Sequence, residues 1–180
     1  DGMENSSILD GLRKMMPDKS ELTDISNNGF RQNAAVVKSQ AEGLPIYYSE
    51  WNENAIFSAY TNDTRKVAAY LVKVALDIDG SSIWCFSDIF EEFSEFPQEF
   101  HGGFGLMTHS GVPKPQYYAL KMLNDLAENR LDLGDGATDQ EIGVAAFSGN
   151  GRIQILLFRQ KMKNLDLPKE KATICVELNK

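Results

Sequence analysis

Residues 44–52 read LPIYYSEWN, an apolar stretch that ends in the carboxylate of Glu50. Its isoleucine and tyrosines favour extended backbone, so we predict a short strand over residues 44–49. A second stretch, SSIWCFSD at residues 81–88, predicts another short strand. Both runs are largely apolar without strict alternation, which is typical of parallel strands whose two faces are covered by helices.

The segment before the first predicted strand and the segment between the two strands have apolar residues at helical spacing. A turn at Asn28-Gly29 is expected to precede a helix that ends near Gly43. Between the strands we predict a longer helix, with Asp63 as its N-cap and its end at Gly80. The apolar face of the first helix comprises Phe30, Ala34, Val37 and Ala41, and that of the second comprises Val67, Leu71, Val74, Ala75 and Ile78.

Two further helices are predicted, over residues 8–16 and residues 116–129. The second is expected to bury Tyr118, Met122, Leu123 and Leu126. The resulting order of helix, strand, helix, strand and helix favours an α/β fold with a parallel sheet. The loops after the strands are the longest and carry the unusual residues, which is expected of a (β/α)₈ barrel, because its sites lie on those loops.

The pattern changes after residue 130. The turn-rich segment DLGDGATDQ (132–140) precedes EIGVAAFS, GRIQILLFRQ and KATICVELN, which read as strands separated by Asn150-Gly151 and by a loop that contains Pro168. We therefore predict one unit over residues 1–130 and part of an antiparallel sheet over residues 131–180.

Composition narrows the function classes. The chain has 180 residues, of which 42% are hydrophobic and 24% charged, as in globular proteins. Its net charge is −8 and it has no basic stripe, so we expect no nucleic-acid binding by this chain. No apolar run is long enough for a membrane helix, and no signal peptide is visible, which favours a cytoplasmic location. Cys85 and Cys175 have no further Cys or His at metal-ligand spacing, so we expect neither a disulfide nor a metal site, and no cofactor.

Chemically distinctive residues follow each predicted strand. Glu50 and Asn52 follow the first strand, while Trp84 and the pair Glu91-Glu92 lie in or after the second. Because the carboxyl ends of neighbouring parallel strands open onto one cleft, these side chains are expected to converge. Carboxylates accept hydrogen bonds from sugar hydroxyls, and an aromatic ring stacks on the apolar face of a pyranose, so this set suits a carbohydrate.

Each of these residues also has a plain structural interpretation. A single glutamate at a strand end is usually a surface charge, and a tryptophan in an apolar run usually packs in the core. Glu91-Glu92 can belong to a solvated acidic loop, and His101 can belong to a turn. Spacing alone leaves these alternatives open.

A combination of motifs carries a family resemblance. The segments YYSEWN (47–52), NDT (62–64), IWCFSDIFEE (83–92) and FHGGFGLMTHSGVPKPQYYALKMLNDL (100–126) occur in this order. Together they resemble the C-terminal part of a β-xylosidase of glycoside hydrolase family 39. The similarity runs from about Phe30 to Leu126 and continues weakly into the strands after Glu141.

The resemblance implies a fold and a set of site residues. The family fold is a (β/α)₈ TIM barrel of the clan A glycosidase type, followed by an accessory β-sandwich; residues 1–130 match about strands 6–8 of the barrel. The family nucleophile corresponds to Glu50, with Asn52 beside it. The residues that correspond to the subsite for the non-reducing xylose are Trp84, Glu91, Glu92, His101 and Phe104. Related barrels often carry a non-proline cis peptide after the tryptophan, so we predict one at Trp84-Cys85.

One element of the family's site is missing from this chain. A retaining glycosidase needs a second carboxyl group as general acid and base, and in the family it belongs to an Asn-Glu-Pro motif on the fourth strand. The only Asn-Glu pair here is Asn52-Glu53, and no proline follows it. We therefore expect the isolated chain to be inactive and to need the missing N-terminal barrel segment as a partner.

Two other functions within the resemblance stay open. AraC-type transcription regulators carry a domain of this family as a sugar sensor; an Asn-Glu-Pro motif upstream would favour the enzyme, and a helix-turn-helix would favour the regulator. An α-L-iduronidase is disfavoured, because we expect a different motif around its nucleophile. The substrates that the first interpretation implies are xylosides or xylo-oligosaccharides, and the sequence gives no oligomeric state.

Overall fold

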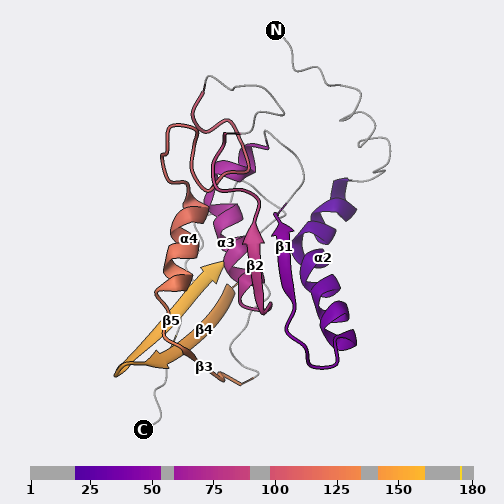
Figure 1. Ribbon diagram of the computed structural model, residues 1–180, viewed down its shortest axis with the longest axis vertical. Coiled ribbons are helices and arrows are strands. Elements are labelled where there is room, and N and C mark those ends of the chain that lie inside the picture. Colours follow the sequence, from indigo (N-terminus) through magenta and orange to yellow (C-terminus); the bar gives the residue numbers. More distant parts are fainter. Residues whose placement is uncertain (1–18, 54–58, 90–97, 135–141, 161–174, 176–180) are drawn as a thin grey trace.

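A computed structural model describes residues 19–53, 59–89, 98–134, 142–160 and 175 (Figure 1). Three helices, a short 3₁₀ helix and two sheets make up this part of the chain. The elements are α2 (Lys19–Gln40), β1 (Tyr47–Trp51), η1 (Tyr60–Asp63), α3 (Arg65–Ala75), β2 (Gly80–Ile83), α4 (Pro115–Asn124), β3 (Asn129–Leu131), β4 (Ile142–Gly149) and β5 (Arg152–Arg159).

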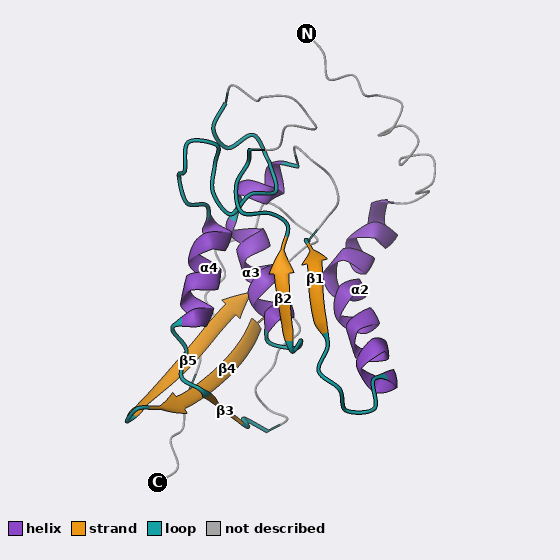
Figure 2. Cartoon of the chain, in the orientation of Figure 1, coloured by secondary structure: helices purple, strands orange, loops and turns teal. Residues whose placement is uncertain are grey.

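β1 and β2 form a parallel pair connected through α3, which confirms the predicted parallel strands. Their register joins Tyr47 to Gly80 and Trp51 to Ile83, with an irregularity between Tyr48 and Trp51. Because the strands are parallel, both carboxyl ends lie at one edge, where the loops after β2 and before α4 gather (Figure 2). β2 ends at Ile83, so Trp84 follows the strand and is not part of it.

Helices cover one face of this two-stranded sheet. The ring of Trp51 stacks on Phe30 of α2, with 4.9 Å between centroids, and lies 6.1 Å from the ring of Tyr70 on α3. The buried residues of this first core are Trp51, Val67, Tyr70, Leu71 and Val74. The opposite face is open in the described part of the chain: Tyr47 is 73% exposed, and Ser82, which points to the same face, is exposed. The expectation that helices cover both faces is therefore met on one face only.

The second sheet is antiparallel and has the order β3-β4-β5. β4 and β5 pair along their whole length: Ile142 lies opposite Arg159 at one end, and Gly149 lies opposite Arg152 at the other. The turn between them uses Asn150 with φ of 51° and Gly151 with φ of 73°, which is the conformation that a two-residue hairpin requires. This hairpin was predicted. β3 was not predicted, because a strand of only three residues is too short to show an alternating apolar pattern.

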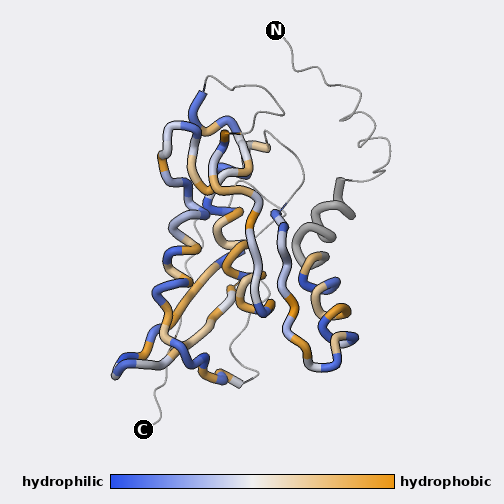
Figure 3. Tube along the Cα trace, in the orientation of Figure 1, coloured by the Kyte–Doolittle hydropathy of each residue, from blue (hydrophilic) through white to orange (hydrophobic). Residues whose placement is uncertain are grey.

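A second core joins this sheet to α3 and α4, so α3 contributes to both cores. β5 is hydrophobic along most of its length (Figure 3), and its alternate residues face the helices. The buried residues of this core are Val72, Ala119, Ala127, Ala145, Phe147 and Leu156. The predicted antiparallel segment thus packs directly on the α/β unit.

Several helix boundaries differ from the predictions; α3, for example, ends at Ala75 and not at Gly80. The turn predicted at Asn28-Gly29 is wrong, because α2 continues through both residues; each costs a helix at most about 1 kcal/mol relative to alanine, which a helix of 22 residues tolerates. The N-cap of α3 is Thr64, whose hydroxyl accepts a hydrogen bond from the Lys66 amide at 3.3 Å. Asp63 belongs to η1 and has other partners, described below.

The buried side of the segment around α4 was predicted only in part: Leu123 and Leu126 pack against the second core as predicted, but two other residues do not. Tyr118 and Met122 are 53% and 54% exposed, whereas Gln116 and Ala119 are buried. The helix ends at Asn124 because the chain turns there toward β3. The helix predicted over residues 8–16 and the strand predicted in KATICVELN lie outside the described residues, apart from Cys175.

Burial raises the pKa of the Tyr70 phenol to about 12, and the nearby Glu53 carboxylate adds to the shift. The folded state therefore keeps this proton between about pH 10 and 12, where an unfolded chain loses it. We expect the free energy of unfolding to fall as pH rises through this window, and to fall less in Tyr70→Phe. Urea unfolding at pH 9 and pH 11 measures both. Tyr118→Phe, which alters an exposed tyrosine, should behave as wild type; equal losses in Tyr70→Phe and wild type would contradict the assignment.

Candidate active site

Glu50 lies on β1, one residue before the end of the strand, and its side chain is exposed. Its neighbour Trp51 is buried against the helices, and successive strand residues point to opposite faces. The irregular register between Tyr48 and Trp51 is of the kind that redirects side chains beside active sites. Glu50 therefore projects from the face that the helices do not cover.

Asn52 connects the ends of the two strands. Its amide Nδ2 donates a hydrogen bond to the carbonyl of Trp84, while its Oδ1 accepts one from the Glu53 amide at 2.8 Å. The Trp84 amide in turn donates to the Trp51 carbonyl at 3.0 Å. The predicted cis peptide bond between Trp84 and Cys85 is confirmed. Trp84 is 38% exposed and is held beside the segment that carries Glu50.

The loop that carries His101 and Phe104 runs beside the segment after β2. The Leu106 amide donates to the Cys85 carbonyl at 3.0 Å, and the Asp88 amide donates to the Met107 carbonyl at 2.9 Å. His101 Nδ1 lies 3.0 Å from the Gln98 carbonyl, and both His101 and Phe104 are half-buried. This pairing brings the predicted sugar-binding loop to the strand ends. Glu91 and Glu92 lie outside the described residues.

A buried lysine lies beneath this loop. Lys114 Nζ, which is fully buried, lies 2.6 Å from Oδ1 of Asp63 and 2.6 Å from Oδ2 of Asp88. It also donates a hydrogen bond to the Gly103 carbonyl at 3.0 Å. We call Lys114, Asp63 and Asp88 the ion cluster. Its two carboxylates share one ammonium, which supplies the partners that buried charges require.

Two buried amides extend these contacts. Asn62 Nδ2 donates to the Gly102 carbonyl at 2.8 Å. Gln116 Nε2 donates to the carbonyls of Asn62 and Gly105, at 2.7 and 3.0 Å. η1, the glycine-rich loop and the start of α4 are thereby joined by buried polar contacts.

The glycines of the loop allow it to approach the segment after β2 closely. A Cβ at Gly103 would lie 2.3 Å from Oδ1 of Asp88, and a Cβ at Gly105 would lie 2.3 Å from the backbone nitrogen of Asp88. Gly103 would meet the Asp88 carboxylate, which Lys114 and the Gly105 amide hold in place, and Gly105 would meet backbone. The motif HGGFG therefore reflects close packing of two backbone segments.

Two titratable groups around the loop have shifted pKa values. Hydrogen bonds from Ser110 and then Thr108 hold the pKa of Glu99 below its ordinary value, and His109 Nδ1 lies 3.2 Å from its carboxylate. Burial raises the pKa of the Cys85 thiol. Among the residues that the structure describes, no group of His, Cys, Asp and Glu side chains has the arrangement of a metal site.

Of the predicted site residues, Glu50, Asn52, Trp84, His101 and Phe104 lie on neighbouring segments at one end of the parallel sheet. The residues that sequence reasoning missed are those of the ion cluster. Asp63 was interpreted as a helix cap, and Lys114 was only part of a family motif. The available signal was one lysine and two aspartates within the motifs that carry the family resemblance, but their separation along the chain hid their contact.

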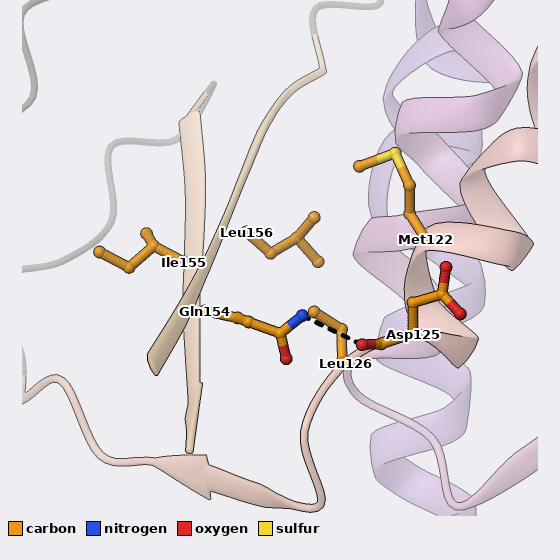
Figure 4. A pocket seen from close by; sticks show the side chains of 6 residues that line it. All are labelled: Met122, Asp125, Leu126, Gln154, Ile155 and Leu156. Atoms are coloured by element: carbon orange, nitrogen blue, oxygen red, sulfur yellow. Dashed lines mark hydrogen bonds between the residues drawn. The ribbon is translucent and has the colours of Figure 1, made fainter. Parts of the chain in front are cut away.

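One pocket lies away from this region, between the end of α4 and β5 (Figure 4). It has a volume of about 320 Å³ and is lined by Met122, Asp125, Leu126, Gln154, Ile155 and Leu156. Gln154 Nε2 donates to the Asp125 carbonyl at 3.0 Å. α4 begins at the loops beside the strand ends and runs away from them (Figure 1), so this pocket is separate from the Glu50 region.

None of the described helices has both the length and the apolar character needed to cross a bilayer.

Comparison with known proteins supports a single family. The model of glycosyl hydrolases family 39 matches residues 10–178. A β-xylosidase of Caldicellulosiruptor saccharolyticus is 39% identical over 99 residues, which cover 52% of this chain and 20% of that protein. A β-xylosidase of Geobacillus stearothermophilus is 33% identical over 102 residues, covering 54% and 20%. The matched region thus spans about one fifth of the length of these relatives.

Solved structures give the same result. A monomeric β-xylosidase of Caulobacter crescentus superimposes with a TM-score of 0.59 and 29% identity, over 72% of this chain and 27% of that one. A family 39 enzyme of Xanthomonas axonopodis pv. citri gives a TM-score of 0.60 and 27% identity, over 76% and 28%. These neighbours imply a TIM-barrel-type glycosidase fold of mixed helices and strands. The chain belongs to glycosyl hydrolase family 39.

Proposed function

We propose that this chain is the C-terminal part of the catalytic barrel of a retaining β-xylosidase, and that it supplies the nucleophile Glu50. The observation that carries the proposal is the position of Glu50 at the carboxyl end of a parallel strand, on the face opposite the helices. In a closed barrel this face is the interior, and this end holds the active site. The β-xylosidases among the relatives support xylosides as the substrate class.

The proposed reaction proceeds in two displacements. A carboxylate oxygen of Glu50 bonds to the anomeric carbon as the bond to the leaving oxygen breaks, and a general acid protonates that oxygen. Water then attacks the anomeric carbon, the ester bond to Glu50 breaks, and the same acid residue, now a base, accepts the water proton. Trp84 offers an exposed ring surface for the sugar, and Asn52 holds Trp84 beside the nucleophile.

The second carboxyl group must come from outside this chain. The two groups of a retaining enzyme lie about 5–5.5 Å apart, and this sequence contains no Asn-Glu-Pro motif. The exposed face of β1 and β2 gives an independent reason, because parallel sheets are normally covered on both sides. We therefore propose that the remaining barrel strands cover this face and bring the general acid opposite Glu50.

The residues after 130 have a separate proposed role. We propose that β3, β4 and β5 are strands of an accessory β-sandwich, with the boundary near residue 131. The apolar residues Ile153, Ile155 and Leu157 are 39–55% exposed on the sheet face away from α3 and α4, which suits a further sheet packed there. The catalytic proposal does not depend on this assignment.

The stereochemical course of hydrolysis tests the proposal. The full-length protein that contains this chain is incubated with an aryl β-xyloside, and proton NMR follows the first anomer of xylose released. We expect the β-anomer to appear first, because two displacements retain configuration. Initial release of the α-anomer would contradict a retaining mechanism, and xylose binding without turnover would favour a sugar sensor.

A further inference from the structure

Lys114 lies beneath the candidate site but takes no part in the proposed chemistry. Its ammonium contacts Asp63 from η1, Asp88 from the segment after β2 and the carbonyl of Gly103. These segments lie far apart in the sequence, and Lys114 itself precedes α4. One buried cation therefore fixes four parts of the chain relative to one another.

Both carboxylates of the ion cluster also hold the loop through its backbone. Oδ2 of Asp63 accepts a hydrogen bond from the Gly102 amide at 2.5 Å, and Oδ1 of Asp88 accepts one from the Gly105 amide at 2.7 Å. Together with the bond from Lys114 to Gly103, three backbone groups between residues 102 and 105 depend on the cluster. Phe104 lies within this stretch, and His101 directly precedes it.

The same cluster borders the segment of Trp84. The Phe104 carbonyl accepts a hydrogen bond from the Cys85 amide at 3.4 Å, and the Leu106 amide donates to the Cys85 carbonyl at 3.0 Å. Cys85 follows Trp84 across the cis peptide. A shift of the loop would therefore move the backbone that presents the Trp84 ring.

Stability alone accounts poorly for such a cluster. Buried ion clusters lose much of their electrostatic gain to desolvation, and apolar residues of similar volume often replace them without loss of stability. What apolar side chains cannot reproduce is a directional hold on specific backbone amides and carbonyls. The geometry of the loop is thus the property that depends most on the charges.

We propose that Lys114 is a positioning residue for the sugar subsite, acting through Asp63 and Asp88 on the loop of His101 and Phe104 and on Trp84. The proposal rests on the proposed function for its substrate. It assigns to Lys114 an effect on substrate binding and alignment, and none on the protonation of Glu50.

The test uses two variants of the full-length protein and one control. Lys114→Met removes the ammonium but leaves two carboxylates buried without it, so it can fail to fold. The triple variant Asp63→Asn, Asp88→Asn, Lys114→Met removes all three charges together and avoids unpaired buried charge. The control is Lys38→Met, which breaks an exposed ion pair with Asp79 at the amino ends of β1 and β2, opposite to the end that carries the candidate site.

We expect kcat/KM for an aryl β-xyloside to fall by about 100-fold in the folded variants, because a small misplacement of binding groups has effects of this size. KM should rise and competitive inhibition by xylose should weaken, while the acidic limb of the pH profile of kcat/KM stays in place. Hydrogen exchange should accelerate in residues 98–108 and remain unchanged in α2. Lys38→Met should match wild type in every measurement.

Loss of folded protein alone would lower the apparent kcat and leave KM unchanged, so unchanged KM and xylose affinity in folded variants would overturn the proposal. Unchanged exchange in residues 98–108 would do the same. If the wild-type protein turned over no xyloside, the proposed function would fail, but hydrogen exchange would still decide whether Lys114 positions the loop.

Discussion

Replacing Glu50 with glutamine is expected to lower the turnover of an aryl β-xyloside by about 10⁴-fold or more, as loss of a nucleophile does in other enzymes with covalent intermediates. Glutamine keeps the size of the side chain but cannot bond to the anomeric carbon. Since Glu50 is exposed and contributes to neither core, the thermal midpoint should change little. Steady-state kinetics and thermal unfolding of the full-length protein measure the two effects.

Glu42→Gln is the matched control, because Glu42 is an exposed carboxylate that precedes the same strand. Its kcat/KM should remain within twofold of wild type. A variant with alanine at position 50 should regain xyloside cleavage with azide, which can enter the vacated space and attack the anomeric carbon. A Glu50→Gln protein that retains a tenth or more of wild-type turnover would show that another residue is the nucleophile.

Replacing Gly105 with alanine is expected to cost about 3 kcal/mol of unfolding free energy, the upper part of the range for added groups in packed sites. The new Cβ would lie 2.3 Å from the Asp88 nitrogen and 2.5 Å from the Met107 carbonyl oxygen. Both are backbone atoms of the paired segments 85–88 and 104–107, so relief requires the loop to separate from its neighbour. Urea unfolding measures the loss, and KM for the xyloside should rise with it.

Gly111→Ala separates this clash from the general cost of replacing a glycine. Gly111 has φ of 81°, but nothing lies within 4 Å of the position of an added Cβ. Alanine there should cost only about 1 kcal/mol, through the unfavourable φ, and leave KM unchanged. Equal destabilisation by the two substitutions would mean that close packing of the loop is not the reason why position 105 requires glycine.

The sequence predicted those features that depend on local pattern. The apolar runs around Tyr48 and Ile83 predicted a parallel pair, and Asn150-Gly151 predicted a hairpin, because few other residues adopt positive φ at both turn positions. The cis peptide at Trp84-Cys85 was predicted from family resemblance, not from physical chemistry. These predictions are confirmed.

Features that depend on distant contacts were not predictable in this way. Asp63 was placed at a helix cap because aspartate favours that position. Its carboxylate instead forms an ion pair with Lys114, 51 positions further along the chain. Tyr118 and Met122 fit a buried helical face by spacing, but α4 buries Gln116 instead, since its amide donates a hydrogen bond to a carbonyl of the loop. Side chains that bond across the fold can override periodicity.

The position of Glu50 illustrates the same limit for the candidate site. The parallel strand that carries it was predicted, whereas the face of β1 opposite the helices is open in the described residues. Enclosure of a barrel site needs strands from the whole ring. The matched part of the chain corresponds to about 27–28% of the family structures compared above.

The most direct test of the account is to trap the covalent intermediate. The full-length protein is incubated with a 2-fluoro-xylosyl donor, digested, and mapped by mass spectrometry. We predict a single fluoroxylosyl label on the peptide that contains Glu50, with no label in Glu50→Gln. A label on any other residue, or labelling that persists in Glu50→Gln, would contradict the assignment of Glu50 as the nucleophile.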